Sequence, residues 1–591
     1  MKYSLLFTLL STPLLAASYK VEDIKFPPSV PPEVGGIDFA PDGTLFAVLR
    51  RGDVMRARPA TDPTKWKWEL FATGFHNGCG IDAVSRDKVR VTQMADFTEA
   101  TDTNNDGIAD QYRIFAAGWG LSGNYHETNT ITEDGKGGYY IAIGTASHNG
   151  PTAEHTLGEY SKFGRRGRNF ASVKWRGCTL YCDPKGKLSP FCFGFRMHNG
   201  IHQDSAGNLW CGDNQGDWRA TTPLYHLEKG NFYGHPSALV WDERWPEDKD
   251  PLHTYREDLE AYNKHRTWPS VQIPHREMNR SAGEPYEIPK NFPHFPGQML
   301  LPDNNSKRIT RIMLEKVNGK FQGACTHFLN GGGLRSGNHR IRFSSDQQQI
   351  YVGQTVRGWG KEAEGLQRIT PNGNEPFDIT AFKITPQGFK ITFTRELEKD
   401  LAAKDLKFKS FTYQSKWTYG SPQENITDNQ VQSVKHLSAK TVEVTLDKFK
   451  PGRVYQLDLE ELKSKDILKD KTEDGEDYNK EKKLHFEFDL KYGDVEQLEV
   501  KLLLSIGGDS VKLTANGKFL TDFWTNRIGF NLLLPLNGVV GEKVDIINSD
   551  NSSELSKFPL NISPNQPMVK FNNLSYHHYF FENINNVAYY T

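Results

Sequence analysis

The chain has 591 residues and a formal net charge of -1 at pH 7, and 25% of its residues are charged. This length is too great for one compact core, so roughly two to four domains are expected. The near balance of acids and bases gives no sign of a nucleic-acid partner or of binding to an acidic membrane surface. Aromatic residues make up 12% of the chain, and with many glycines and prolines they favour an all-β protein with many turns.

Residues 1–18 are predicted to be a signal peptide. Lys2 is followed by an apolar run from Leu5 to Leu15 and then by small residues up to Ser18, as in secretory leaders. The run is too short to cross a bilayer, and no second segment reaches spanning length. We therefore expect a secreted or periplasmic protein without a transmembrane segment.

Export bears on the six cysteines, because disulfides are the default in an oxidising compartment. Four of the six lie between Cys178 and Cys211. The sequence selects no pairing. A zinc site at Cys178 and Cys182 is an alternative, although no second cysteine pair lies nearby.

Residues 19–375 are predicted to form a β-propeller of roughly six blades. A polar turn followed by an aromatic-containing strand recurs along this region, and a sandwich built from so many hairpins would be much shorter. The recurring turns carry Asp42, Asp134, Asp204 and Asp346. Two long segments, 146–172 and 242–290, interrupt the pattern and are expected to form walls around the central funnel.

The pattern changes near Pro376. Alternating strands with few glycines follow, and residues 376–495 are predicted to form a β-sandwich of immunoglobulin or fibronectin type. Residues 496–591 are Leu- and Asn-rich and are expected to form a C-terminal β-rich region.

The segment DTNNDGIAD, residues 102–110, has the oxygen spacing of a calcium loop. Gly107 permits the sharp turn that such a loop needs. A metal-free turn rich in Asp and Asn is the alternative, because no helix pattern flanks the segment. The candidate metal ligands are Asp102, Asn104, Asp106, the carbonyl of Ile108, and Asp110.

A second polar loop, GDNQGDW at 212–218, is followed closely by KGNFYGHP at 229–236. Two such loops separated by one short strand predict a strand pair whose ends line one rim of the funnel. The alternative is two turns that connect strands, with Asp and Asn side chains bonded to the backbone.

These segments, taken in order, resemble the soluble quinoprotein glucose/sorbosone dehydrogenase family. FGFRMHNGIHQDSAGNLWCGDNQGDW, GNFYGHP, QGACTHF and VGQTVRGW are similar to its secreted bacterial branch, which is labelled membrane-bound dehydrogenase. The resemblance covers roughly residues 30–375. It implies a six-bladed propeller with pyrroloquinoline quinone (PQQ) at its mouth, assisted by calcium.

The resemblance also implies roles for individual residues. By motif position His126 is the base that takes the proton of the sugar hydroxyl as hydride moves to the quinone. Guanidinium groups suit the three carboxylates of the cofactor. The implied cofactor-binding residues are Arg196, Asn199, Gln215, Asp217, Arg340 and Arg342.

The leading hypothesis is therefore a calcium-assisted dehydrogenase of a sugar, or of a sugar-derived alcohol or aldehyde. It needs an external electron acceptor, such as a separate cytochrome or a quinone, because the sequence has no c-type haem motif. A non-catalytic carbohydrate-binding or surface protein is the first alternative. The second is a polysaccharide hydrolase or lyase that uses His126 or His198, since fold alone does not decide function.

Overall fold

The computed structural model describes residues 18–122, 129–147, 156–163, 169–355 and 363–459, and isolated strands elsewhere. Contacts divide the chain into two units. The large unit comprises residues 12–466 and 584–591, and the small unit comprises residues 1–11 and 467–583.

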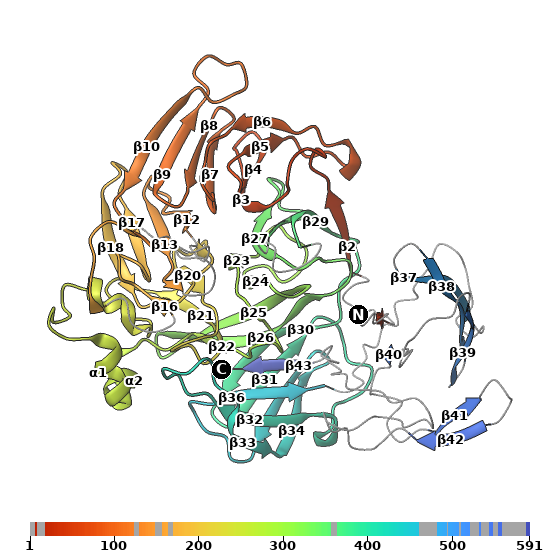
Figure 1. Ribbon diagram of the computed structural model, residues 1–591. Coiled ribbons are helices and arrows are strands. Elements are labelled where there is room, and N and C mark those ends of the chain that lie inside the picture. The colour runs from red at the N-terminus through yellow and green to blue at the C-terminus, as the bar shows by residue number, and fades with distance from the viewer. Residues whose placement is uncertain are drawn as a thin grey trace. The chain divides into compact units, whose positions relative to one another are not determined.

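The described part of the large unit contains a ring of six β-sheet blades (Figure 1). Each blade has four antiparallel strands. In blades 1 to 5 the innermost strand comes first in the chain, whereas the last blade takes its outermost strand from the N-terminal part of the chain. Blades 1 and 2 are β3 (Val34–Phe39), β4 (Leu45–Leu49), β5 (Val54–Ala57) and β6 (Glu69–Ala72), then β7 (Gly80–Ser85), β8 (Lys88–Thr92), β9 (Asp96–Thr101) and β10 (Gln111–Ala117). Blades 3 and 4 are β12 (Asn129–Glu133), β13 (Tyr139–Ile143), β17 (Cys178–Cys182) and β18 (Leu188–Phe193), then β19 (Ile201–Gln203), β20 (Leu209–Gly212), β21 (Thr222–Leu227) and β22 (Val271–Ile273). Blade 5 is β23 (Tyr286–Glu287), β24 (Met299–Asp303), β25 (Arg308–Val317) and β26 (Lys320–Asn330).

The two ends of the ring meet in blade 6. Its inner strands are β27 (Asn338–Phe343), β28 (Ile350–Gln354) and β29 (Gly365–Pro371), and its outermost strand is β2 (Tyr19–Ile24). The first strand of the ring thus pairs with the last, and no edge is left at the junction. The predicted six-bladed propeller is confirmed.

The recurring turn aspartates occupy one structural position. Each lies between the first and second strands of a blade and accepts a hydrogen bond from the amide two residues later. This side-chain bond fixes a tight turn. The four residues are Asp42, Asp134, Asp204 and Asp346.

Glycines let the innermost strands approach one another around the axis. A Cβ atom on Gly35 would lie 1.8 Å from the carbonyl oxygen of Gly78, and one on Gly200 would lie 2.1 Å from Cα of Glu284. No larger residue fits at either position, so the sequence itself sets the narrow diameter of the ring.

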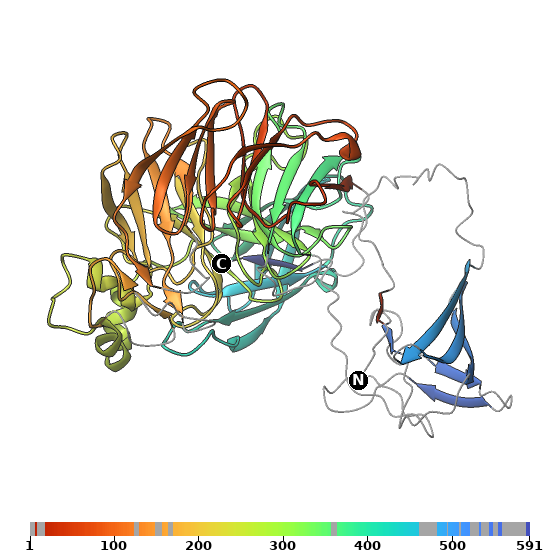
Figure 2. The same cartoon turned by 45° about the horizontal axis from the view of Figure 1, so that its top comes forward.

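The first of the two expected walls, residues 146–172, has short strand pairs in its described parts: β11 (Leu121–Ser122) with β15 (Thr156–Leu157), and β14 (Ala146–Ser147) with β16 (Asn169–Phe170). The second, residues 242–290, contains α1 (Pro251–Glu257), α2 (Leu259–His265) and strands β22 and β23. The helices project from the side of the ring (Figures 1 and 2). Asp250 and Asp258 cap their N-termini. Short 3-10 helices occupy Pro63–Lys65, Pro236–Trp241 and Ala403–Asp405.

A β-sandwich follows the propeller and shares a sheet with it. One layer is β30 (Ile379–Thr385), β31 (Gly388–Phe393), β35 (Thr441–Leu446) and β34 (Val431–Ser438). The other is β43 (Val587–Tyr590), β36 (Val454–Asp458), β32 (Lys407–Thr412) and β33 (Glu424–Asn429), and it continues blade 5 because β43 pairs with β26. A core rich in phenylalanine fills the space between the layers.

The small unit contains β37 (Lys482–Tyr492), β38 (Val495–Gly507) and β39 (Ser510–Phe519) in one sheet. Two further pairs are β1 (Leu6–Thr8) with β40 (Asn531–Leu533), and β41 (Lys543–Ile547) with β42 (Ser553–Lys557). The expected boundary at 495/496 falls within β38, after its first residue, whereas the contacts divide the chain after Asp466.

The expected disulfides are wrong. All six cysteines are free and buried. In the hairpin of β17 and β18, Cys178 pairs with Phe193 and Cys192 with Thr179, so the two thiols point to opposite faces of the sheet. Cys178 and Cys182 belong to one apolar cluster and Cys192 and Cys211 to another. The cysteines act as small core residues.

None of the helices in the described segments is long and apolar enough to cross a membrane.

Candidate functional site

The topology of the blades gathers the predicted site residues on one face. Antiparallel strands alternate in direction, so the loops that link successive blades and the loops between second and third strands lie at the same end. We call this end the mouth face. Its loops include residues 50–53, 73–79, 194–200, 213–221 and 331–337.

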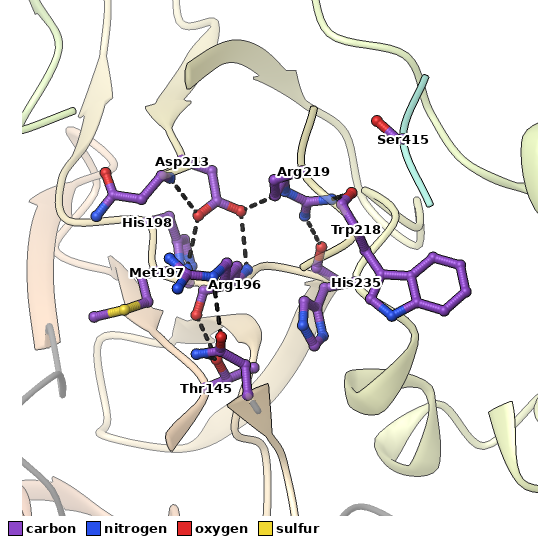
Figure 3. A network of polar contacts seen from close by, with 12 residues as sticks. Thr145, Arg196, Met197, His198, Asp213, Trp218, Arg219, His235 and Ser415 are labelled. Carbon is purple, nitrogen blue, oxygen red and sulfur yellow. Dashed lines mark hydrogen bonds and ion pairs between the residues drawn. The ribbon is translucent and has the colours of Figure 1, made fainter. Parts of the chain in front are cut away.

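Asp213 organises the mouth face of blade 4 from a fully buried position. Its carboxylate accepts hydrogen bonds from the amides of Arg196 and Met197 at 2.9 and 2.7 Å, and Nε of Arg219 donates to it at 2.7 Å (Figure 3). Burial by itself raises the pKa of Asp213, but Arg219 and these amides more than offset it, and the pKa is lowered. Asp213 therefore stays ionised and ties two mouth loops together.

Arg219 gives its hydrogen bonds to the protein. Besides Asp213, it bonds to the carbonyl oxygens of Trp218 and Gly194, and the ring of Tyr225 lies 5.5 Å away. The Asp213–Arg219 pair is completely enclosed. It is a structural element beneath the mouth and not a ligand site.

His198 lies in the same network and is also fully buried. Its ring stacks on Phe195 at 4.1 Å, and Nε2 lies 3.1 Å from Oγ1 of Thr179. Burial lowers the pKa of His198 to about 3, so the imidazole is neutral at physiological pH. This enclosed, neutral imidazole gives no support to the hydrolase hypothesis.

Arg340 crosses the centre of the mouth from blade 6. It donates to the carbonyl of Cys79 at 2.9 and 3.1 Å, to the carbonyl of Asn199 at 2.7 Å, and to that of His339 at 2.8 Å. The guanidinium thus joins blades 2, 4 and 6. Its partners are neutral oxygens, and the nearby carboxylate of Glu284 already bonds to another arginine.

Arg50 brings a second guanidinium to the same place. Nε and Nη2 donate to the amide oxygen of Asn77 at 2.8 and 2.5 Å, and the side chain lies beside Cys79. Burial lowers the pKa of both Arg50 and Arg340, and the charge of Arg50 lowers the pKa of Arg340 further. Burial and then these two arginines lower the pKa of the neighbouring His339. No carboxylate of the described residues pairs with Arg50.

Arg342 lies deeper in the channel and is neutralised there. It donates to Asp38 at 3.1 Å and to Glu284 at 2.7 Å. Burial opposes its charge, but these two carboxylates prevail and raise the pKa of Arg342. The expected role of Arg342 as a cofactor ligand has no support in this geometry, because both of its carboxylate partners belong to the protein.

Arg196 links the propeller to two neighbouring structures. Its Nε donates to the side chain of Asn169 in the first wall at 3.0 Å. Its guanidinium lies 5.4 Å from the ring centre of Tyr419, which belongs to the sandwich. Oγ1 of Thr145 donates to its carbonyl at 2.6 Å.

The GDNQGDW loop, which carries Gln215 and Asp217, lies on the mouth face and contacts the sandwich. It binds the sandwich segment 414–421. Gln215 packs against this segment at Gly420, Asp217 forms a backbone bridge to Tyr419, and the amide of Trp218 donates to the segment at 2.8 Å. The loop therefore also makes a contact between domains, and the expected role of Gln215 and Asp217 stays a prediction.

Two other predictions have different outcomes. His126 lies outside the described residues. The predicted calcium loop, residues 102–110, joins β9 to β10 on the face opposite the mouth. Its carboxylates accept hydrogen bonds from the loop's own amides, and no three acidic, histidine or cysteine side chains of the described residues gather around a metal position. Calcium binding there stays a prediction.

Sequence reasoning missed Arg50, Asp213 and Arg219. An arginine doublet in the turn RRGD and an Asp-x5-Arg spacing inside a glycine-containing loop were the available patterns. Neither is specific, since such turns are usually exposed and solvated.

Comparisons with known proteins add family matches for two parts of the chain. Residues 61–273 match a family model described as a domain of unknown function, DUF7133. Residues 467–582 match the N-terminal domain of D-apionate lactonase. No curated protein matches the chain.

Solved structures with a similar fold include three carbohydrate-related proteins. The PQQ domain of Coprinopsis cinerea pyranose dehydrogenase is 13% identical, with 60% of this chain and 95% of that chain covered and a TM-score of 0.41. PQQ-bound aldose sugar dehydrogenase from Streptomyces coelicolor is 15% identical, with coverages of 60% and 98% and a TM-score of 0.41. A Trichoderma reesei carbohydrate-active enzyme of family AA12 is 10% identical, with coverages of 63% and 100% and a TM-score of 0.44. At these identities and TM-scores the likeness carries no argument about activity.

Proposed function

We propose that the protein is a carbohydrate-oxidising propeller enzyme that holds an anionic quinone cofactor at its mouth. The observation that carries the proposal is the pair Arg50 and Arg340. Both guanidiniums lie at the centre of the mouth face, and their hydrogen-bond partners are neutral oxygens. Glu33 and Glu364 near Arg50, and Glu284 near Arg340, partly offset these charges, but none of the three forms an ion pair with them. Because a buried charge without a direct partner is costly, an anionic ligand would supply one.

The positive charges at the mouth suit the three carboxylates of PQQ. Only some of the cofactor-binding residues expected from the sequence meet there. Arg340 and Asn199, both expected from the sequence, meet there, and Arg50 joins them. Arg342 is paired with Asp38 and Glu284, and the side chain of Gln215 donates to the carbonyl of Ala220. We propose Arg50, Arg340 and Asn199 as the residues that hold the cofactor.

The bound quinone would supply the hydride acceptor for a sugar alcohol or aldehyde carbon. His126 is proposed as the base that takes the hydroxyl proton, by motif position alone. Calcium assistance, an external electron acceptor and a secreted or periplasmic location complete the proposal.

Titration of the purified protein with PQQ, with and without calcium, tests the proposal. Binding is followed by quinone absorbance and turnover by dye reduction with a panel of sugars. Arg50→Gln should weaken PQQ binding roughly 10- to 100-fold, since hydrogen bonds to charged groups contribute about 1.5–3 kcal/mol. Arg50→Lys should restore part of the loss because it keeps the charge.

Arg51→Gln is the matched control. Arg51 is the next residue, is exposed, and pairs with Glu33 at 2.6 Å. It should bind PQQ like the unmodified protein. Absence of PQQ binding and of dye reduction in the unmodified protein, or an equal effect of both substitutions, would overturn the proposal.

The alternative of a non-catalytic carbohydrate-binding protein has its own supporting observation. Exposed aromatic side chains lie together beside the mouth face. Saccharide binding that is unchanged by PQQ, in a protein that reduces no dye, would favour it.

A further inference from the structure

Three of the five exposed aromatic residues of the described chain lie on the sandwich and on the connection that follows α2, and the other two are Tyr112 and Tyr160. Of the three, Trp268 and Trp417 have 52% and 37% of their surface accessible, and Tyr419 is 51% exposed. Trp417 and Tyr419 lie two residues apart in the connection between β32 and β33. We call these three residues the aromatic platform.

Each ring of the aromatic platform rests on an arginine. A cation over the face of an aromatic ring holds the ring in place. The pairs are Arg266 with Trp268 at 3.6 Å, Arg256 with Trp417 at 5.5 Å, and Arg196 with Tyr419 at 5.4 Å.

The three rings share a buried support. Trp218 lies 6.4 Å from Trp417 and 4.9 Å from Tyr262, both measured between ring centres. Arg266 lies over Tyr262 and bonds to Ser415, two residues before Trp417. Figure 3 shows Ser415 of the sandwich close to Trp218 of the propeller.

The segment that carries two of the rings is fixed by its backbone. The amide of Trp218 donates to Lys416 at 2.8 Å, and the amides of Gly420 and Ser421 donate to the propeller at 3.0 and 3.1 Å. Tyr419 also forms a bridge to Asp217. A surface fixed in this way loses little conformational entropy when a ligand binds.

We propose that the aromatic platform binds an oligosaccharide chain and that the sandwich thereby forms part of the substrate site. Flat rings beside hydrogen-bonding groups suit a pyranose, which presents C–H groups on its faces and hydroxyls at its edge. Arg256, Lys416 and the phenol of Tyr419 supply such groups. The patch lies next to Arg196 on the mouth face, so a bound chain can extend from the platform toward the mouth.

The inference rests on the proposed function only for the link to oxidation. Binding is therefore measured without cofactor, by calorimetry with di- to hexasaccharides of the cello, manno, xylo and galacturonate series. We expect affinity for at least one series to rise about tenfold from disaccharide to hexasaccharide, which corresponds to about 1.4 kcal/mol.

Tyr419→Ala and Trp268→Ala should each weaken hexasaccharide binding about tenfold and leave disaccharide binding at the mouth unchanged. Trp417→Phe keeps a ring against Trp218 and should have a smaller effect. Ile426→Ala is the matched control, because Ile426 is 60% exposed on the same sandwich and away from the platform.

Failure of every series to bind would overturn the inference, as would equal binding by the platform variants and Ile426→Ala. Length-dependent saccharide binding without dye reduction would support the platform and count against the dehydrogenase proposal alone. The two proposals thus fail separately.

Discussion

Arg50 and Arg51 are neighbours in the sequence with opposite surroundings. Arg51 points to solvent and pairs with Glu33, while Arg50 turns into the mouth and bonds to Asn77. Only the second is placed to act on a ligand at the axis of the ring. A doublet of this kind gives a controlled comparison, because both substitutions remove one positive charge from the same turn.

Asp82, in the innermost strand of blade 2, should make stability depend on pH. Burial, and next the charge of Asp38, raise the pKa of Asp82 from 3.8 to about 6. The folded state therefore binds this proton more tightly than the unfolded chain, and stability falls as pH rises from about 4 to about 6. The shift corresponds to roughly 2–3 kcal/mol.

Denaturant unfolding of Asp82→Asn and the unmodified protein at about pH 4 and pH 8 measures this contribution. The unmodified protein should lose about 2 kcal/mol more than the variant on going to the higher pH. Asp248→Asn, which alters an exposed carboxylate, is the control and should follow the unmodified protein. Identical pH dependence in Asp82→Asn would count against a raised pKa.

At the scale of the elements, β43 gives the sandwich an unusual order. The chain leaves the sandwich after β36, passes through the small unit, and returns as β43 beside β36, with Asp458 opposite Val587. The small unit is thus inserted between two adjacent strands. The family match at 467–582 coincides with this insertion.

Replacement of residues 460–586 by a short turn should leave the propeller and sandwich folded. Directly paired residues of antiparallel strands lie only about 5 Å apart, so a tight loop can join the two ends. Calorimetry should show the main unfolding transition within a few degrees of the full-length value. Truncation after Asn583, which removes β43 and so leaves one edge each of β26 and β36 without a partner, should lower that transition clearly. Equal behaviour of the two deletions would contradict the inserted arrangement.

At the scale of the whole molecule, ring closure depends on six residues near the N-terminus. β2 pairs along its full length with β29. Tyr19 is buried, its hydroxyl lies 2.9 Å from Nδ1 of His294, and its ring lies 4.7 Å from that of Phe328. The expected signal peptide ends one residue before this strand, so cleavage there would leave the closing strand whole.

A chain that begins at Lys25 should be less stable than one that begins at Ser18 by about 3–5 kcal/mol. The truncation exposes the edge of β29 and removes the buried side chains of Tyr19 and Ile24. Thermal unfolding of the two purified forms measures the difference. Equal midpoints would show that the ring does not need β2.

Much of the fold could be predicted from the sequence because its signs are local. The turn aspartates and the strand alternation each act within a few residues, and they led to the propeller and the sandwich. The disulfide expectation failed for a geometric reason. Whether two thiols meet depends on strand register and on the face each side chain occupies, and neither is visible in cysteine spacing.

The candidate site was predictable only in part. Arg340 and Asn199 follow from motif position and do meet at the mouth. Gln215 and Asp217 lie in an equally distinctive loop, yet that loop binds a segment some 200 residues later in the chain. Arg50 had no distinguishing pattern, because its role arises from the neutral oxygens that surround it.

The sequence by itself indicated a propeller of roughly six blades followed by a β-sandwich, since these depend on short-range patterns, and the family resemblance pointed to Arg340 and Asn199 for the mouth. Only the tertiary structure decided which arginine is neutralised by carboxylates and which is not, and that the sandwich contributes aromatic rings beside the mouth. Both outcomes depend on contacts between residues far apart in the chain, whose geometry is set by packing and not by local propensity.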